Sequence, residues 1–120
     1  AAPLVVDRFP FTDARDSRVL RRGTRDRYGC ANQTEGGNEI VYRLHRTKAA
    51  RVNIRVFSLD GADHDLQLLT ADGAETCILR DDKLLTVDLP VGDTLLVVDA
   101  FGPVGTAKDG EFLLTVVETL

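Results

Sequence analysis

The stretch RVNIRVFSL, residues 51–59, constrains the fold most because its apolar residues recur at every second position. Val52, Ile54 and Val56 alternate with polar residues along this stretch. A period of two places one row of side chains toward a core and the other row toward water, which is typical of a half-buried β-strand. The stretch therefore predicts a strand and excludes an amphipathic helix at this position.

Strand patterns of the same kind recur through the chain after residue 38. We expect further strands at 39–44, 65–70, 76–79, 84–89, 94–101 and 111–119. Turn signals separate them roughly every 8–12 residues, including the Asp72-Gly73 pair, and no convincing amphipathic helix interrupts them. The sequence predicts an all-β fold, an antiparallel β-sandwich of jelly-roll-like type. Residues 94–101 are nearly all apolar, as expected of a strand covered on both faces.

The chain length of 120 residues fits one domain with a core of its own. We expect residues 39–120 to form the sandwich core and residues 1–38 an N-terminal extension, with residues 4–6 as a candidate edge strand; together they make one domain. The sequence begins at Ala1 and contains no methionine, which favours a processed product or an excised piece.

Charge and hydropathy exclude two classes of protein. The net charge of −4 argues against a general nucleic-acid binder. No apolar run approaches the length of about 18 residues that a membrane span needs, so we expect no membrane span.

An arginine-rich segment lies before residue 28. Its members are Arg15, Arg18, Arg21, Arg22, Arg25 and Arg27. Such a cluster either contacts an anionic ligand or forms ion pairs with aspartates of its own domain. The sequence leaves both interpretations open.

The two cysteines, Cys30 and Cys77, are far apart, and neither belongs to a metal-binding pattern of closely spaced cysteines and histidines. A disulfide between them is the favoured interpretation, and two buried free thiols are the alternative. A disulfide predicts a protein outside the reducing cytosol, that is, secreted, periplasmic or extracellular.

The stretch SLDGADHDLQLL, residues 58–69, carries Asp60, Asp63 and Asp65 within six residues. Carboxylate oxygens spaced along a loop are ligands that calcium prefers, so these three are the candidate metal ligands and calcium is the one cofactor suggested. Their spacing is not that of an EF-hand. The competing interpretation is a turn at Asp60-Gly61 followed by hydrogen bonds at the start of a strand.

Signs of catalysis are weak. His45 and His64 are candidate general bases, and Ser17 and Ser58 are the only serines, but neither serine lies in a G-x-S-x-G motif. We therefore expect both histidines to be surface residues beside strands, and we expect the chain not to be an enzyme. A stand-alone enzyme would need a cleft that joins one of these histidines to carboxylates from distant loops.

Several motifs together suggest a family. They are VYRL (41–44), RVNIRVFSLDGADHDLQLL (51–69), LPVGDTLLVVDAF (89–101), GEFLLTV (110–116) and the lead-in FPFTDARDSRVL with DRYGCA. Over residues 9–119 the chain resembles the bacterial pre-peptidase C-terminal domain family, secreted β-sandwich modules of extracellular hydrolases that include the collagen-binding domains of clostridial collagenases.

The resemblance implies a non-catalytic secreted accessory module of an extracellular hydrolase, serving targeting, solubility or maturation. Its implied partners are the parent or neighbouring hydrolase domain and a cell-wall or extracellular polysaccharide or protein. Collagen binding does not carry over, because the chain has only Tyr28 and Tyr42 and Tyr42 falls on the core-facing register. The alternative is a calcium-dependent carbohydrate-binding or adhesion module.

Overall fold

The computed structural model describes residues 3–19, 39–73, 76–102 and 107–119. These residues form nine strands: β1 (Leu4–Val6), β2 (Phe11–Asp16), β3 (Glu39–Arg46), β4 (Ala50–Ser58), β5 (His64–Thr70), β6 (Cys77–Asp81), β7 (Leu84–Leu89), β8 (Gly92–Ala100) and β9 (Glu111–Glu118). Within the described ranges the one helical element is a single 3-10 turn, η1 (Ser17–Val19). The predicted all-β fold is confirmed.

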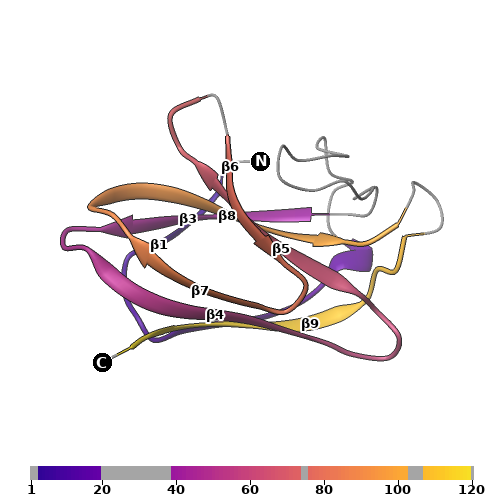
Figure 1. Cartoon of the computed structure of the whole chain (residues 1–120). Helices are drawn as coiled ribbons and strands as arrows, with labels where there is room; N and C mark the ends of the chain where they lie inside the picture. The colour runs from indigo at the N-terminus through magenta and orange to yellow at the C-terminus, as the bar shows by residue number, and fades with distance from the viewer. Residues whose placement is uncertain (1–2, 20–38, 74–75, 103–106, 120) are drawn as a thin grey trace.

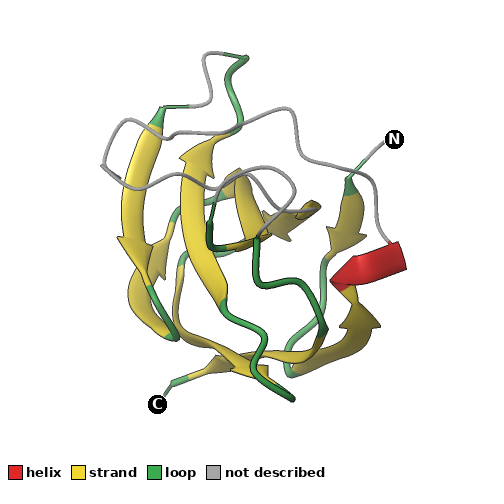
Figure 2. Ribbon diagram, turned by 90° about the vertical axis from the view of Figure 1, so that its right-hand side faces the viewer, coloured by secondary structure: helices red, strands yellow, loops and turns green. Residues whose placement is uncertain are grey.

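The strands form two sheets that pack face to face, as Figures 1 and 2 show. One sheet has five strands in the order β1-β3-β8-β5-β6, and the other has four in the order β2-β9-β4-β7. β1 is parallel to β3, and all other neighbours are antiparallel. From β3 to β5 and from β6 to β9 each successive strand changes sheet, which is the connectivity of a sandwich.

The core lies between the sheets and is built by the inward rows of the strands. In β4 the apolar row Val52, Ile54 and Val56 is at most 2% exposed, as the alternation predicted. The other strands contribute similar rows, and the main apolar cluster is Val6, Tyr42, Leu44, Val52, Ile54, Val56, Leu66, Leu68, Leu85, Leu89, Leu96, Val98, Phe112, Leu114 and Val116.

The N-terminal part belongs to both sheets. β1 lies at the edge of the five-stranded sheet, and β2, which the sequence analysis did not identify, lies at the edge of the four-stranded sheet beside β9. The inward row of β2 contains Asp13, whose Oδ2 accepts hydrogen bonds from the Tyr42 hydroxyl and from Arg15 Nε, both at 2.6 Å. Polar side chains on an inward row hide the alternation that marks a strand in the sequence.

The two sheets differ in how their faces are covered. β5 and β8 are buried on both sides: residues 64–69 and 94–100 are all buried. The outer rows of these strands hold a second apolar cluster of Leu69, Leu95 and Val97. β8 is the central strand of its sheet, so the expectation for residues 94–101 is confirmed. In β4 and β9, buried and more accessible residues alternate, so the outer face of the four-stranded sheet is accessible.

Candidate functional site

A tight turn at residues 59–62 carries Asp60. Asp60 and Gly61 both have positive φ, 54° and 78°, and Ala62 N donates to Leu59 O at 3.0 Å. Two central residues with positive φ and an i to i+3 hydrogen bond define a type I′ turn, and here the turn leads from β4 in one sheet to β5 in the other. The interpretation of Asp60-Gly61 as a turn is confirmed, and Asp60 lies exposed at its tip.

The other two aspartates of this stretch each bind a cationic side chain. Lys83 Nζ donates to Asp63 Oδ1 at 2.8 Å and also to the His64 carbonyl at 2.8 Å. Arg80 Nη2 donates to Asp65 Oδ2 at 2.8 Å. In the described part of the chain, no group of three or more His, Cys, Asp or Glu side chains is arranged to hold a metal ion. A calcium ion would have to displace both cations, and calcium binding stays a prediction.

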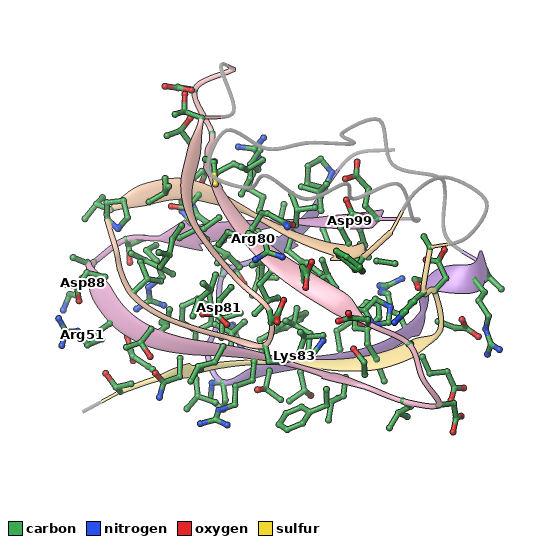
Figure 3. All side chains as sticks on the ribbon, turned by 45° about the vertical axis from the view of Figure 1, so that its right-hand side comes forward. Arg51, Arg80, Asp81, Lys83, Asp88 and Asp99 are labelled. Atoms are coloured by element: carbon green, nitrogen blue, oxygen red, sulfur yellow. The ribbon has the colours of Figure 1, made fainter. Side chains whose placement is uncertain are left out.

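Asp65 also belongs to a row of carboxylates on the outer face of the five-stranded sheet. It lies opposite Asp99 in the strand register, and Asp99 lies opposite Glu39. Figure 3 labels Arg80 and Asp99 in this part of the molecule. Asp65 and Asp99 are buried, and buried carboxylates require compensating charge, of which Arg80 supplies a part. Neither carboxylate is accessible to a ligand from solvent.

His64 is not a surface residue, and that expectation was wrong. Its side chain is fully buried and lies against Phe112, with ring centroids 4.7 Å apart. Both serines of the chain contact it: Ser17 Oγ is 2.8 Å from Nε2, and Ser58 Oγ is 2.8 Å from Nδ1. Ser17 is distant in the sequence, so no linear motif signals this cluster.

One hydrogen-bond arrangement satisfies the whole cluster. Ser17 Oγ accepts from Gly110 N at 3.0 Å and donates to Gly110 O at 3.2 Å. It then accepts from Nε2–H of His64, while the Ser58 hydroxyl donates to Nδ1. Burial, together with the nearby Lys83 charge, lowers the pKa of His64 to about 4, so the ring is neutral at pH 7. Because this histidine is enclosed, its role is to connect η1, β4 and β5.

His45 lies instead at an open hollow of about 520 Å³. Its Nδ1 is 2.6 Å from Asp93 Oδ1, and this contact is the main cause that lowers the pKa of Asp93. The pair meets the geometric condition that a stand-alone enzyme would need. The hydroxyls that line the hollow belong to Thr70, which donates to Asp72 Oδ1 at 2.8 Å, and to Thr94, which is buried. Among the described residues, neither hydroxyl makes a hydrogen bond to His45.

Of the arginine-rich segment, the structure describes Arg15 and Arg18, and each binds the aspartate two positions earlier in the chain. Arg15 contacts Asp13 and Arg18 contacts Asp16, each at 2.6 Å. Arg21, Arg22, Arg25, Arg27 and Cys30 lie outside the described residues. Cys77 is the first residue of β6. Anion binding by the arginine segment and the disulfide between Cys30 and Cys77 therefore stay predictions.

The outer face of the four-stranded sheet carries several exposed apolar side chains. We call it the β4–β9 face, defined by Asn53, Arg55, Phe57, Leu84, Thr86, Leu113, Thr115 and Val117. Its apolar members are substantially exposed: Phe57 47%, Leu84 36%, Leu113 39% and Val117 45%. The sequence predicted only that the row with Asn53 and Arg55 faces water. The neighbours across the sheet depend on the register, which the sequence alone does not fix.

Arg55 lies in the middle of this face. In the strand register it stands between Thr115 on β9 and Leu84 on β7. Its guanidinium makes no hydrogen bond or ion pair with another described residue. Arg51 lies on the same row of β4 but beyond the defined face, and its Nε and Nη2 donate to Asp88 at 2.8 and 3.1 Å. Figure 3 shows Arg51 and Asp88 together at one end of the sandwich.

The paired sheets and their strand order define a β-sandwich with the fold of a pre-peptidase C-terminal domain. A solved structure with this fold is the pre-peptidase C-terminal domain of a collagenase from Bacillus anthracis, with a TM-score of 0.64. The two chains are 14% identical, and the match covers 96% of this chain and 94% of the other. No family model and no curated protein sequence matches this chain. The resemblance suggested by the motifs is confirmed at the level of the fold.

No helix among the described residues is long and apolar enough to cross a membrane.

Proposed function

We propose that the chain is a non-catalytic accessory module of a secreted hydrolase and that it acts by binding through the β4–β9 face. The observation that carries this proposal is the likeness to the pre-peptidase C-terminal domain of a collagenase over almost the whole chain. Fold alone does not define a function, so the proposal also draws on the sites. The exposed apolar side chains Phe57, Leu84 and Leu113 form a surface suited to contact with another molecule.

The side chains with catalytic chemistry support a non-catalytic role. His64 is enclosed by Ser17, Ser58 and Phe112 and does not reach solvent. His45 pairs with Asp93 at an open hollow without an activated nucleophile among its described lining residues. An accessory role places the chain in the periplasm or outside the cell, where a disulfide between Cys30 and Cys77 would persist.

The test compares a hydrolase encoded in the same reading frame, or by a neighbouring gene, with and without residues 1–120. We expect an unchanged kcat on a small soluble substrate. We also expect a loss of retention on insoluble substrate or a loss of yield of mature enzyme. A matched control is the hydrolase joined to a chain with the double substitution Phe57→Ser and Leu113→Ser, which changes the β4–β9 face and no core residue.

If removal of the chain abolishes turnover of the small soluble substrate, the chain supplies catalytic groups and the proposal is wrong. If retention and yield are unchanged on removal, the chain is not an accessory module of that hydrolase.

A further inference from the structure

The β4–β9 face is a sheet surface open to a partner. On the opposite side of the molecule, the outer rows of β5 and β8 are buried at every position from 64 to 69 and from 94 to 100. On β4 and β9 the outer rows alternate with core residues and are accessible. A partner that lies across the central strands of a sheet therefore finds accessible side chains on β4 and β9, which Figure 1 shows as neighbours in the lower layer.

Apolar side chains on this face surround one cation, the Arg55 guanidinium, which no described carboxylate neutralises. Phe57 lies opposite Leu113, two positions along β4 from Arg55, and Leu84 lies opposite Arg55 itself. A guanidinium carries five donors and no acceptor. Beside it, Thr86 Oγ1 donates to Asn53 Oδ1 at 2.8 Å, so the free polar group of Asn53 is its amide NH₂, another donor. Because the available polar groups in the centre of the face are hydrogen-bond donors, a negatively charged acceptor complements them.

We propose that the β4–β9 face binds a protein segment that presents aliphatic side chains around one carboxylate, and that this carboxylate pairs with Arg55. The assignment of the segment to a hydrolase rests on the proposed function. A carboxylate matches the planar fork of a guanidinium with two parallel hydrogen bonds. The leucine and valine side chains of the face, on either side of Arg55, stabilise the complex when apolar side chains of the segment cover them. A polysaccharide, which carries hydroxyl groups, provides little apolar surface for this contact.

The size of the face favours a tethered partner over a second copy of this chain. The three strands of the face, about 4.8 Å apart, with about five residues along each strand, give a patch of about 240 Å². A stable complex buries about 800 Å² on each partner, so the face binds weakly in isolation. Weak binding suffices when the partner belongs to the same polypeptide, because a short linker gives an effective concentration in the millimolar range. A symmetric dimer through this face would also bring two Arg55 side chains together.

The experiment titrates the isotope-labelled chain with two synthetic peptides followed by NMR. Both peptides have leucine at alternating positions, and they differ only in a single central glutamate or lysine. We expect the glutamate peptide to shift the amide signals of β4 and β9 with millimolar affinity and the lysine peptide to bind about fivefold more weakly, as expected for one exposed ion pair.

Three variants localise the effect. Arg55→Ala should reduce the affinity for the glutamate peptide about fivefold, and Arg55→Glu should reverse the preference so that the lysine peptide binds better. The matched control is Arg51→Ala, which removes an exposed arginine of the same strand that already binds Asp88, and it should leave the affinity unchanged. Both substituted positions, Arg51 and Arg55, are exposed, and unchanged dispersion of the core signals checks that each variant is folded.

The proposal is overturned if the peptides shift other residues, if they bind equally, or if neither shifts β4 and β9 at millimolar concentration. It is also overturned if an acidic oligosaccharide shifts these amides more strongly, or if sedimentation shows a dimer that Arg55→Glu dissociates. These outcomes concern the face alone. If removing the chain lowers retention or yield, the accessory role stands even when the peptides do not bind. If removing the chain changes neither, peptide binding to the face can still be observed.

Discussion

At the scale of single residues, His64 shows how the fold decides the role of a side chain. The sequence places it in a polar stretch with three aspartates, which suggests an exposed histidine. The fold instead encloses it between Ser17, from the N-terminal part, and Ser58. No local pattern predicts this, because the contact to Ser17 depends on how β2 and η1 lie against the segment that leads into β9.

The neutral state of His64 makes the stability of the fold depend on pH. Its pKa is lowered from 6.5 to about 4 by burial, with Lys83 lowering it further and Asp63 and Asp109 opposing. Between these values the unfolded chain binds more protons than the folded one, so the free energy of unfolding falls as pH decreases from 6.5 to 4. The loss amounts to about 3 kcal/mol. Denaturant unfolding measured at pH 7, 6 and 5 checks it.

The control for this prediction is the other histidine. His64→Gln should be less stable than the parent at pH 7 and should lose most of the pH dependence above pH 5, whereas His45→Gln should keep it. If the stability of His64→Gln depends on pH as strongly as that of the parent, groups other than His64 cause the pH dependence.

At the scale of elements, the sequence predicted the strands whose burial follows a simple pattern. Residues 51–59 alternate and residues 94–101 are continuously apolar, and the structure has β4 and β8 there. β2 was not predicted because its inward row includes the polar residues Asp13 and Arg15. These two bind each other, and Asp13 also accepts a hydrogen bond from Tyr42. The β4–β9 face was predictable only as a row of β4, since its neighbours on β7 and β9 depend on long-range register.

β6 is the element that a disulfide would stabilise most. It lies at the edge of the five-stranded sheet, pairs with β5 alone, and its register shifts at Leu68/Leu69. We predict that Cys77, at its first residue, is bonded to Cys30. Reduction should then lower the free energy of unfolding by up to about 4 kcal/mol, the value of the chain-entropy argument for a loop of this length. Amide exchange in β6 should accelerate before that in β4.

Alkylation followed by mass spectrometry measures this directly. No cysteine should react before reduction, and both should react after it. The double variant Cys30→Ser and Cys77→Ser should match the reduced protein and be insensitive to reductant. Alkylation of both cysteines in the untreated protein would show two free thiols instead.

At the scale of the whole molecule, the stability of the sandwich should not depend on calcium. Asp63 and Asp65 already bind Lys83 and Arg80, and a calcium ion would have to displace both side chains. We expect the melting temperature to be the same in millimolar calcium and in chelator. The calcium-dependent carbohydrate-binding or adhesion module predicts a rise that Asp63→Ala abolishes. The control Asp88→Ala, an exposed position that pairs with Arg51, should retain that rise. That pair of results would favour this alternative.

The unequal covering of the two sheets also limits how such a chain can change over generations. Almost any replacement along β5 or β8 disturbs packing, because each side of these strands is enclosed. Along β4 and β9 every second site is free to vary without disturbing the interior. New specificities can therefore arise on one side of the molecule while the other side holds the architecture constant.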